Sequence, residues 1–393
     1  MDDIVILSAV RTPVGRYGGV LKSLNSGTLA SIAIKEAVKR AGITPKQVDE
    51  VILGEVRQST ESSNVARVAA LRAGVPDTVP AFTINRLCAS GLQAIASGAQ
   101  QISFGQANIV VAGGTESMSN APLYLRNTRF GGDNSKLVDS NTEAGQQPHE
   151  IYGKELGMGI TAENVAERFS ISRQDQDRFA FESQCRAAAA IRDNRFASEV
   201  VPVEVKEKKS TLTVAVDEHP RPETTVEMLS KLRPVFKENG TVTAGNACGR
   251  NDGAAALILT SSSHAEKLGL RPLARIVDWT AVGVSPEVMG IGPVPAIKKL
   301  LERTQLSLDD IDLIELNEAF ASQSLAVIRE LQLDMDKVNV NGGAIALGHP
   351  LGATGAKIVT TLVHELNRRQ AKRGIATLCV GGGQGMAMMV ELL

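Results

Sequence analysis

The chain has few aromatic residues, no excess of charge of either sign and no long apolar run. Aromatic residues make up 3% of its 393 residues, which argues against the stacking surfaces that bind single-stranded nucleic acids. Lys and Arg number 42 and Asp and Glu 43, and the net charge of -1 excludes a protein that coats nucleic acid, although a local phosphate site stays open. No apolar stretch approaches the roughly 18 residues of a membrane span, and the acidic start does not predict a signal peptide. We therefore expect a cytoplasmic protein that binds neither nucleic acid nor membrane.

Cysteine is also scarce, and its spacing excludes the common cysteine motifs. Because none of the four cysteines forms a CxxC pair, we expect neither a zinc ribbon nor a thioredoxin-type redox motif, and we predict no metal site. Glycine, in contrast, is abundant at 36 residues. Together with 43% hydrophobic and 22% charged residues, this composition is typical of a globular α/β protein with many turns. The length predicts two or three domains of roughly 150 residues each.

A duplication organises the chain. Residues 44–55 and 307–318 match in residue type without a gap, and each pattern predicts a capped turn followed by a short apolar strand. Alternation of helices and strands alone is common in α/β proteins, but this ungapped stretch favours duplication. The other predicted elements also follow in the same order, with helix 89–104 matching 351–369 and strands 4–10, 108–112 and 254–260 matching 275–282, 375–380 and 386–392.

The two halves differ in one connection. In the second half, a glycine-rich turn at 381–385 joins the last two strands directly, whereas the same connection in the first half runs from Gly113 to Gly253. Loops at the carboxyl ends of sheet strands are where α/β proteins build sites, so we interpret the insertion as a lid over a substrate. The predicted domains are a first half at 1–118 (completed by 250–270), the lid insertion at 119–249, and a second half at 271–393.

Cys88 lies where a predicted strand at 81–84 turns into a helix of small residues. The positive end of the helix dipole favours a thiolate, which makes Cys88 a candidate nucleophile. Taken alone, the position fits a small buried cysteine without chemistry equally well.

The equivalent turn of the second half contains His349, between Gly348 and Pro350. Proline is favoured at the first position of a helix, so His349 falls in a loop before a helix rather than on a packed face. If the halves pack about a pseudo-twofold axis, Cys88 and His349 meet there as an activated thiol pair. The other histidines lack such framing and are expected mostly on the surface: His149, His219, His264 and His364.

Two further candidates lie at the carboxyl ends of predicted strands. Cys379 precedes the glycines at 381–385, whose exposed backbone N–H groups suit an oxyanion hole or an anion nest. A phosphate loop is not indicated, because the chain has no GxxxxGK[ST] motif. Asn317 follows a strand predicted at 313–316, where its amide either orients a water or an oxygen, or caps the next helix.

Together these segments resemble the thiolase family from end to end. The resemblance implies an α/β fold of five αβαβα layers, in which two βαβαβαββ halves carry a lid, and it implies chemistry on coenzyme A thioesters. The motifs that carry it are residues 85–92 around Cys88, 113–118, 317–320, 348–352 around His349, and Cys379 with 381–385, supported by 11–19 and 243–246.

The resemblance also implies a role for each candidate. Cys88 resembles the nucleophile that carries the acyl group, and His349 resembles the base that activates it. Cys379 resembles the second acid/base, which takes a proton from the α-carbon of the incoming acetyl-CoA. Asn317 resembles the residue that holds a water, which forms one oxyanion hole with His349. The backbone N–H groups of Cys88 and Gly381 would form the other.

Coenzyme A and acyl-CoA are implied as substrates, and no permanently bound cofactor is implied. By resemblance, Arg221 and a loop at 244–249 contact the pantetheine or the nucleotide, while Met158 and Phe320 line the tunnel. The expected loop contacts are Ala244, Ala247 and Cys248. Basic residues of the insertion are further candidates for the phosphates, although the run at 206–209 fits a solvated loop at least as well: Lys208, Lys209, Lys231 and Arg233.

The same resemblance bears on assembly and on specificity. The segment 121–138 resembles a loop through which many thiolases form tetramers, so we expect a homo-oligomer, either a dimer or a tetramer. Cys248 stands where many members carry serine, and Gly157 stands where acetoacetyl-CoA thiolases often place a histidine. Other segments mix degradative and biosynthetic patterns, so chain-length preference stays open.

The sequence thus predicts an acyltransferase that reversibly condenses two acetyl-CoA into acetoacetyl-CoA and CoA through an acyl-cysteine. A degradative 3-ketoacyl-CoA thiolase of broader chain length is the alternative. A non-catalytic thiolase-like protein that binds CoA or lipid is a remote third hypothesis, because such a protein would have lost at least one catalytic group.

Overall fold

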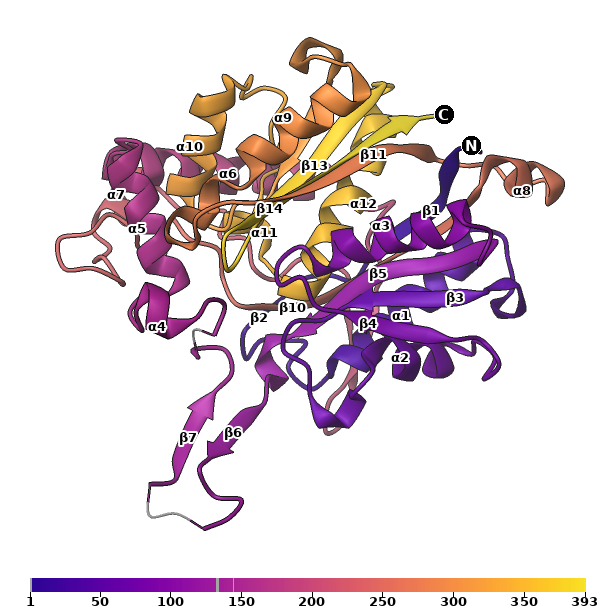
Figure 1. Cartoon of the computed structure of the whole chain (residues 1–393), viewed down its shortest axis with the longest axis horizontal. Helices are drawn as coiled ribbons and strands as arrows, with labels where there is room; N and C mark the ends of the chain where they lie inside the picture. Colours follow the sequence, from indigo (N-terminus) through magenta and orange to yellow (C-terminus); the bar gives the residue numbers. More distant parts are fainter. Residues whose placement is uncertain (1, 132–133, 144) are drawn as a thin grey trace.

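Ten strands join the two halves of the chain edge to edge in one sheet (Figure 1). In this computed structural model, which describes residues 2–131, 134–143 and 145–393, the order is β12-β13-β14-β11-β1-β10-β5-β3-β4, and β2 pairs with β10. The first half contributes β1 (Ile4–Arg11), β2 (Gly15–Arg16), β3 (Glu50–Gly54), β4 (Ala81–Ile84), β5 (Ile109–Ser117) and β10 (Asn251–Ser261). The second half contributes β11 (Ala274–Gly283), β12 (Leu313–Leu316), β13 (Arg373–Val380) and β14 (Gln384–Leu392).

Both halves repeat one strand order outward from their junction. The first half runs β1-β10-β5-β3-β4 and the second runs β11-β14-β13-β12. Beyond β12, Val338 pairs in parallel with Ile314, at the place that β4 takes beside β3. At the junction, β1 and β11 pair antiparallel through residues 4–6 and 274–276. The strands that the sequence matches as equivalents therefore occupy equivalent positions.

Helices form three layers around the two halves of the sheet. Helices α3 (Ser90–Ser103) and α12 (Leu351–Arg369) share one apolar core with the inward faces of both halves, so they form the central layer. Helices α1 (Ser26–Arg40) and α2 (Val65–Ala73) cover the outer face of the first half. Helices α9 (Pro293–Thr304) and α10 (Ala321–Leu331) cover the outer face of the second. These are the five αβαβα layers that the resemblance to thiolases implies.

Small residues bring the two central helices into close contact. A Cβ atom added to Gly355 of α12 would lie 2.2 Å from the backbone nitrogen of Leu92, and one added to Gly91 of α3 would lie 2.8 Å from the carbonyl oxygen of Gly352. Both distances are too short for a side chain, so glycine is required at these positions. The contact aligns the first turns of α3 and α12, and with them the two turns that carry Cys88 and His349.

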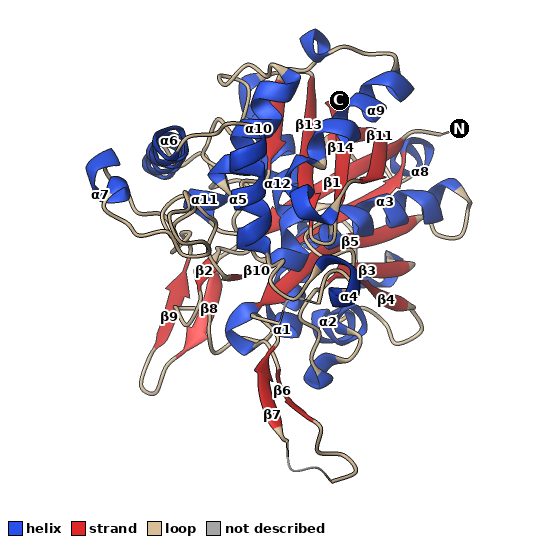
Figure 2. Cartoon of the chain, turned by 60° about the vertical axis from the view of Figure 1, so that its left-hand side comes forward, coloured by secondary structure: helices blue, strands red, loops and turns tan. Residues whose placement is uncertain are grey.

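The chain between β5 and β10 forms an appendage with its own helices and hairpins. It contains α4 (His149–Tyr152), α5 (Met158–Arg168), α6 (Arg173–Arg192), α7 (Val226–Ser230), and the hairpins β6 (Leu123–Arg126) with β7 (Lys136–Asp139) and β8 (Val203–Lys206) with β9 (Thr211–Val214). Ser172 caps the start of α6, where its hydroxyl accepts a bond of 3.0 Å from the Asp175 N–H. Helices α5 to α7 gather beside α10 and the short α11 (Ala344–Leu347), at one end of the second half (Figure 2).

A buried ion cluster ties this appendage to the sheet. Arg11 of β1 lies 2.6 Å from a carboxylate oxygen of Glu199 and 2.7 Å from one of Asp217. All three side chains are buried, and the pairing offsets the cost of removing their charges from water. In the part of the chain that the structure describes, no helix is long and apolar enough to cross a membrane.

Candidate active site

One cavity of about 570 Å³ lies where both halves and the appendage meet. It brings together the three reactive side chains that the sequence singles out, Cys88, His349 and Cys379. It also contains five further predicted site residues, Met158, Ala247, Cys248, Phe320 and Gly381. Arg221 and Ala244 line a second cavity instead, and Asn317 lines neither.

Cys88 sits in a constrained turn between β4 and α3. The preceding residue, Leu87, has a φ of +46°, which a residue with a side chain rarely adopts. The Asn85 side chain accepts a bond of 2.9 Å from the Leu87 N–H, and the Ser90 hydroxyl donates a bond of 2.6 Å to the Leu87 carbonyl. These two short polar side chains hold the strained turn, which presents the Cys88 sulfur to the cavity.

The environment of Cys88 does not favour a resting thiolate, contrary to the expectation from the helix dipole. Burial raises the pKa of the Cys88 thiol above its usual range. The backbone N–H groups of Gly381 and of Cys88 itself act against this, as does the charge of Arg57, but the net shift is upward. A neutral thiol therefore needs a base to remove its proton.

His349 meets the requirement for a neutral base. Its ring is buried, and burial together with the charge of Lys357 lowers the pKa of His349 to about 3. Its backbone N–H donates to Asn251 at 2.9 Å, and its Nδ1 lies 2.6 Å from the Thr354 hydroxyl. The other ring nitrogen, Nε2, is buried without a hydrogen-bond partner among the described residues. One ring nitrogen is thus held, and the other is open to a reacting group.

Cys379 is the second-last residue of β13, and the turn that follows the strand is built from glycine. Gly382 and Gly383 have φ values of +76° and +86°, so side chains would be strained there. Burial raises the pKa of the Cys379 thiol, and the nearby thiols of Cys88 and Cys248 add to the shift. Three cysteines from the two halves and the appendage thus face one cavity.

Asn317 lies just outside the cavity, at the end of β12. It is not the cap of α10, because that helix begins at Ala321 with Phe320 as its cap. Both polar atoms of its buried amide are without a partner among the described residues. A buried amide whose nitrogen and oxygen both lack hydrogen bonds destabilises the fold unless a water or a substrate bonds to them. The helix-cap interpretation of Asn317 is therefore wrong.

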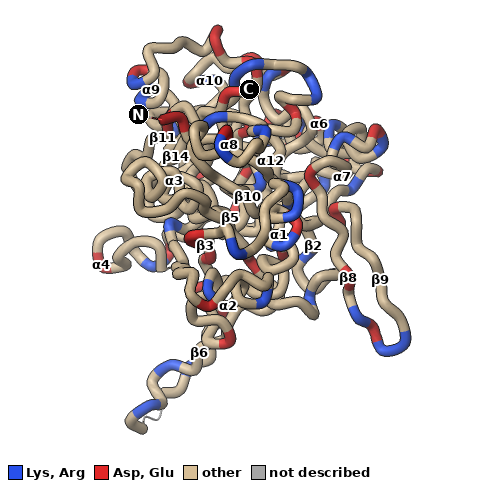
Figure 3. Tube along the Cα trace, turned by 90° about the vertical axis from the view of Figure 1, so that its right-hand side faces the viewer, with Lys and Arg blue, Asp and Glu red and all other residues tan. Residues whose placement is uncertain are grey.

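A second cavity of about 640 Å³ adjoins the first, and both are lined by Val235, Phe236, Ala247, Cys248 and Gly249. The second cavity contains the exposed Arg221 and Ala244, but not Lys208, Lys209, Lys231 or Arg233. Lys208 and Lys209 lie in the loop between β8 and β9, a projecting hairpin with charged residues at its tip (Figure 3). The solvated-loop interpretation fits these two lysines.

Sequence reasoning missed several residues of these cavities. His219 was expected on the surface, yet it lines the second cavity and packs so closely on Gly249 that a Cβ there would lie 2.3 Å from its ring. Burial, with the charge of Arg221, lowers the pKa of His219 to about 4. Arg57 and Gln184 also line the cavities. Proximity to Arg221 in the chain is the one sequence signal that pointed toward His219.

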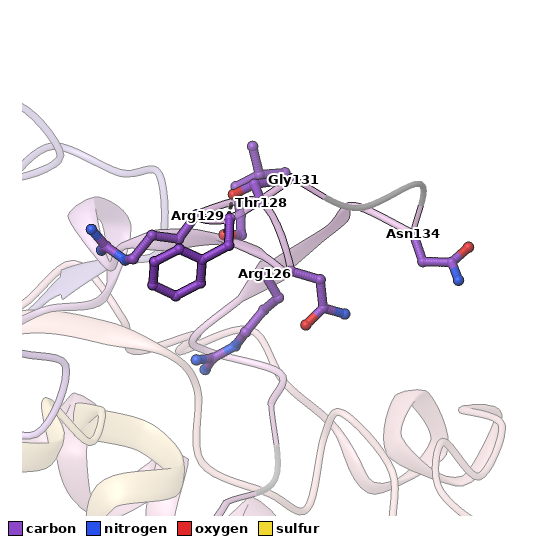
Figure 4. A pocket seen from close by; sticks show the side chains of 8 residues that line it. Arg126, Thr128, Arg129, Gly131 and Asn134 are labelled. Atoms are coloured by element: carbon purple, nitrogen blue, oxygen red, sulfur yellow. Dashed lines mark hydrogen bonds between the residues drawn. The ribbon is translucent and has the colours of Figure 1, made fainter.

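A larger hollow, of about 960 Å³, lies away from these residues at the end of the β6–β7 hairpin (Figure 4). Residues 125–131 and Asn134 line it, and none of them is a cysteine or a histidine. Among the described residues the hollow offers neither a thiol nor an imidazole, so the candidate site is the cavity that contains Cys88. Residues 132 and 133 of the predicted assembly loop lie outside the described residues.

Family models match both halves of this chain. The model for the thiolase N-terminal domain matches residues 4–263, and the model for the thiolase C-terminal domain matches residues 270–392. The chain belongs to the thiolase family. The protein is therefore an acyltransferase. Thiolases act on coenzyme A thioesters and use no permanently bound cofactor.

Individual thiolases resemble the chain over its whole length. It is 50% identical to an acetyl-CoA acetyltransferase of Syntrophomonas wolfei, covering 100% of this chain and 99% of that protein. The solved acetyl-CoA acetyltransferase of Bacillus anthracis superposes with a TM-score of 0.97 at 49% identity, covering 100% and 99% of the two chains. Human mitochondrial 3-ketoacyl-CoA thiolase, solved in complex with CoA, superposes with a TM-score of 0.95 at 47% identity, covering 100% of this chain and 98% of that chain. The chain is thus nearly equally similar to acetyl-CoA acetyltransferases and to a 3-ketoacyl-CoA thiolase.

Proposed function

We propose that this thiolase reversibly condenses two molecules of acetyl-CoA to acetoacetyl-CoA and CoA, through an acetyl group on Cys88. The observation that carries the proposal is the shared cavity of Cys88, His349 and Cys379, beside a His349 nitrogen that has no partner among the described residues. Covalent capture of the acyl group divides one difficult step into two. Retention of all these groups argues against a non-catalytic binding protein.

In the first half-reaction, the Cys88 thiol gives its proton to His349 Nε2, and the sulfur attacks the thioester carbonyl of acetyl-CoA. The bond from carbon to the CoA sulfur then breaks. The departing CoA thiolate takes the proton of Cys379, which leaves acetyl-Cys88, a Cys379 thiolate and a His349 imidazolium. This step accounts for two thiols and one neutral imidazole in the same cavity, since each moves one proton.

In the second half-reaction, the Cys379 thiolate removes a proton from the methyl carbon of a second acetyl-CoA. The resulting enolate carbon attacks acetyl-Cys88, a carbon–carbon bond forms, and the bond to the Cys88 sulfur breaks. That sulfur takes back the proton of His349, so both cysteines return as thiols. The cycle needs no oxidant and no external base.

Both half-reactions develop charge on a thioester oxygen, and the chain offers donors for it. The N–H groups of Cys88 and Gly381 converge on the Cys88 sulfur, which suits the tetrahedral intermediate formed there. The open amide of Asn317 suits a water that faces the enolate oxygen together with His349. Removing one such donor typically costs about 3 kcal/mol of transition-state stabilisation.

We also propose where the substrate lies. The reacting acyl group occupies the first cavity, against Met158 and Phe320, and the rest of CoA passes Ala247 and Cys248 into the second cavity. There Arg221 and Ala244 contact the pantetheine or the nucleotide. Residues 119–249 then serve as the lid, between halves at 1–118 with 250–270 and at 271–393.

We further propose that this thiolase is cytoplasmic and that it forms a homo-oligomer. Apolar side chains on the β6–β7 hairpin support a contact with other copies, since Leu123, Leu125 and Leu137 are each at least 59% exposed. The hairpin projects away from the body of the protein (Figure 1). Light scattering on the purified protein distinguishes a dimer from a tetramer.

The competing function is that of a 3-ketoacyl-CoA thiolase with broader chain length, which the similarity to the human enzyme favours. Thiolysis rates with CoA separate the two, measured with acetoacetyl-CoA and with a long-chain 3-ketoacyl-CoA. We expect a higher kcat/KM for acetoacetyl-CoA. A clear preference for the long chain would overturn the proposed specificity, and no thiolysis of either would overturn the proposed activity.

A further inference from the structure

Thr354 is the one hydrogen-bond partner of the His349 ring in the part of the chain that the structure describes. The Thr354 hydroxyl oxygen lies 2.6 Å from Nδ1, while Nε2 has no partner there. Thr354 lies in the first turn of α12, and its side chain is fully buried. The contact is therefore shielded from water, and a mismatch of donor and acceptor would be costly.

The direction of this hydrogen bond follows from a second contact of the same hydroxyl. The Thr354 hydroxyl donates at 2.9 Å to the carbonyl of Pro350, four residues earlier, as threonine side chains in helices commonly do. A hydroxyl has one proton, so an oxygen that donates to Pro350 can only accept from His349. Nδ1 then carries the hydrogen, and Nε2 carries the lone pair.

We propose that Thr354 is a positioning residue for catalysis, which holds His349 in the tautomer whose Nε2 can accept the Cys88 proton. The inference rests on the proposed function of His349 as the base. When the proton moves from the Cys88 sulfur to Nε2, the Nδ1–H stays in place and the Thr354 oxygen accepts from the imidazolium. The opposite tautomer would present an N–H to the cavity and could not take this proton, as in a catalytic triad whose histidine is locked the wrong way.

Two features suit Thr354 to this task, one of its side chain and one of its surroundings. Its branched β-carbon restricts the side chain to few rotamers in a helix, so the hydroxyl position is well defined. The backbone of His349 is held independently by Asn251, which leaves the ring orientation to Thr354. Backbone and ring are thus fixed by residues from different halves of the chain.

Substitutions at Thr354 test the inference against a matched position on the same helix. Thr354→Ala removes the acceptor, and Thr354→Ser keeps it. Thr360→Ala removes an equally buried hydroxyl that has no partner among the described residues. For acetoacetyl-CoA thiolysis, we expect Thr354→Ala to lower kcat by about tenfold to a hundredfold with little change in KM, the range typical of groups that orient a metal-bound histidine. Thr354→Ser should restore most of kcat, and Thr360→Ala should leave it unchanged.

A second readout follows the Cys88 proton directly. The rate at which iodoacetamide alkylates Cys88, read from the mass of its peptide, should fall in Thr354→Ala and recover in Thr354→Ser. Thermal unfolding identifies a variant that has lost its fold. If Thr354→Ala has lost it, Thr354→Val takes its place, because valine keeps the shape of the side chain without the hydroxyl. If Thr354→Ala keeps the wild-type kcat and alkylation rate, Thr354 does not position His349. If the wild-type protein lacks thiolysis altogether, the proposed function fails instead.

Discussion

Asn251 of the first half holds the backbone of His349 in the second. Its Oδ1 accepts a bond of 2.9 Å from the His349 N–H, and its Nδ2 donates at 2.9 Å to the carbonyl of Gly15. The same Nδ2 lies 3.2 Å from Nδ1 of His219, which lines the second cavity. A single buried amide thus connects both cavities and the turn that carries the proposed base.

Replacing this amide should cost both stability and turnover. Asn251→Ala leaves the buried His349 N–H and the Gly15 carbonyl without this partner, so we expect unfolding to become easier by about 1–3 kcal/mol. The kcat for thiolysis should fall as well, because the His349 turn loses its anchor. Chemical denaturation and steady-state rates measure the two effects. Asn367→Ala, at an exposed position of α12, is the control and should change neither.

A labelling experiment should distinguish the roles of the two proposed catalytic cysteines. After incubation with acetyl-CoA, we expect wild type to carry an acetyl adduct and Cys88→Ala to carry none. Cys379→Ala should acquire the adduct more slowly than wild type, because it lacks the proton that the departing CoA takes. Cys379→Ala should nevertheless fail to condense, since no thiolate removes the α-proton. Intact-mass measurement reads the adduct, and Cys185→Ala on the exposed side of α6 serves as the control. An undiminished adduct in Cys88→Ala would assign the nucleophile to another residue.

The contact between the central helices should be intolerant of any side chain. Gly355→Ala would place a Cβ 2.2 Å from the Leu92 nitrogen, so α3 and α12 must separate. Overpacking of this kind costs roughly 1–3 kcal/mol, and separation also misaligns the Cys88 and His349 turns. We expect a lower melting temperature and reduced activity. Gly145→Ala, where no atom of a non-neighbouring described residue lies within 4 Å of the added Cβ, should leave both unchanged.

Stability should fall as the pH drops, partly because of His349. Its pKa lies near 3 in the folded protein, against an ordinary value of 6.5, so the unfolded chain binds more protons between these values. The free energy of unfolding therefore decreases as the pH falls below about 6.5. Buried Glu55 acts in the opposite sense, because its pKa of about 8 makes the folded state the better proton binder at neutral pH. The difference between wild type and His349→Asn isolates the histidine, and an equal slope in both would contradict the assignment.

Arg221 and Lys209 should differ in their effect on CoA binding. Arg221 lines the second cavity, whereas Lys209 lies in the loop of the β8–β9 hairpin. We expect Arg221→Ala to raise the KM for CoA with kcat nearly unchanged, and Lys209→Ala to have no effect. Since a single exposed contact to a phosphate is screened by salt, the effect of Arg221→Ala should shrink as ionic strength rises. Equal effects of the two substitutions would place the nucleotide elsewhere.

The sequence by itself predicted the duplicated strand order and the insertion, and its resemblance to thiolases singled out the three candidate side chains. The first two features depend on local signals, namely apolar periodicity and glycine and proline at turns. The tertiary structure alone decided the partners of His349, since Asn251 and Thr354 carry no pattern that distinguishes them along the chain. It also reversed the expectation for Cys88, because a helix dipole can be inferred from sequence whereas the loss of water around a thiol depends on the packing of both halves and the appendage.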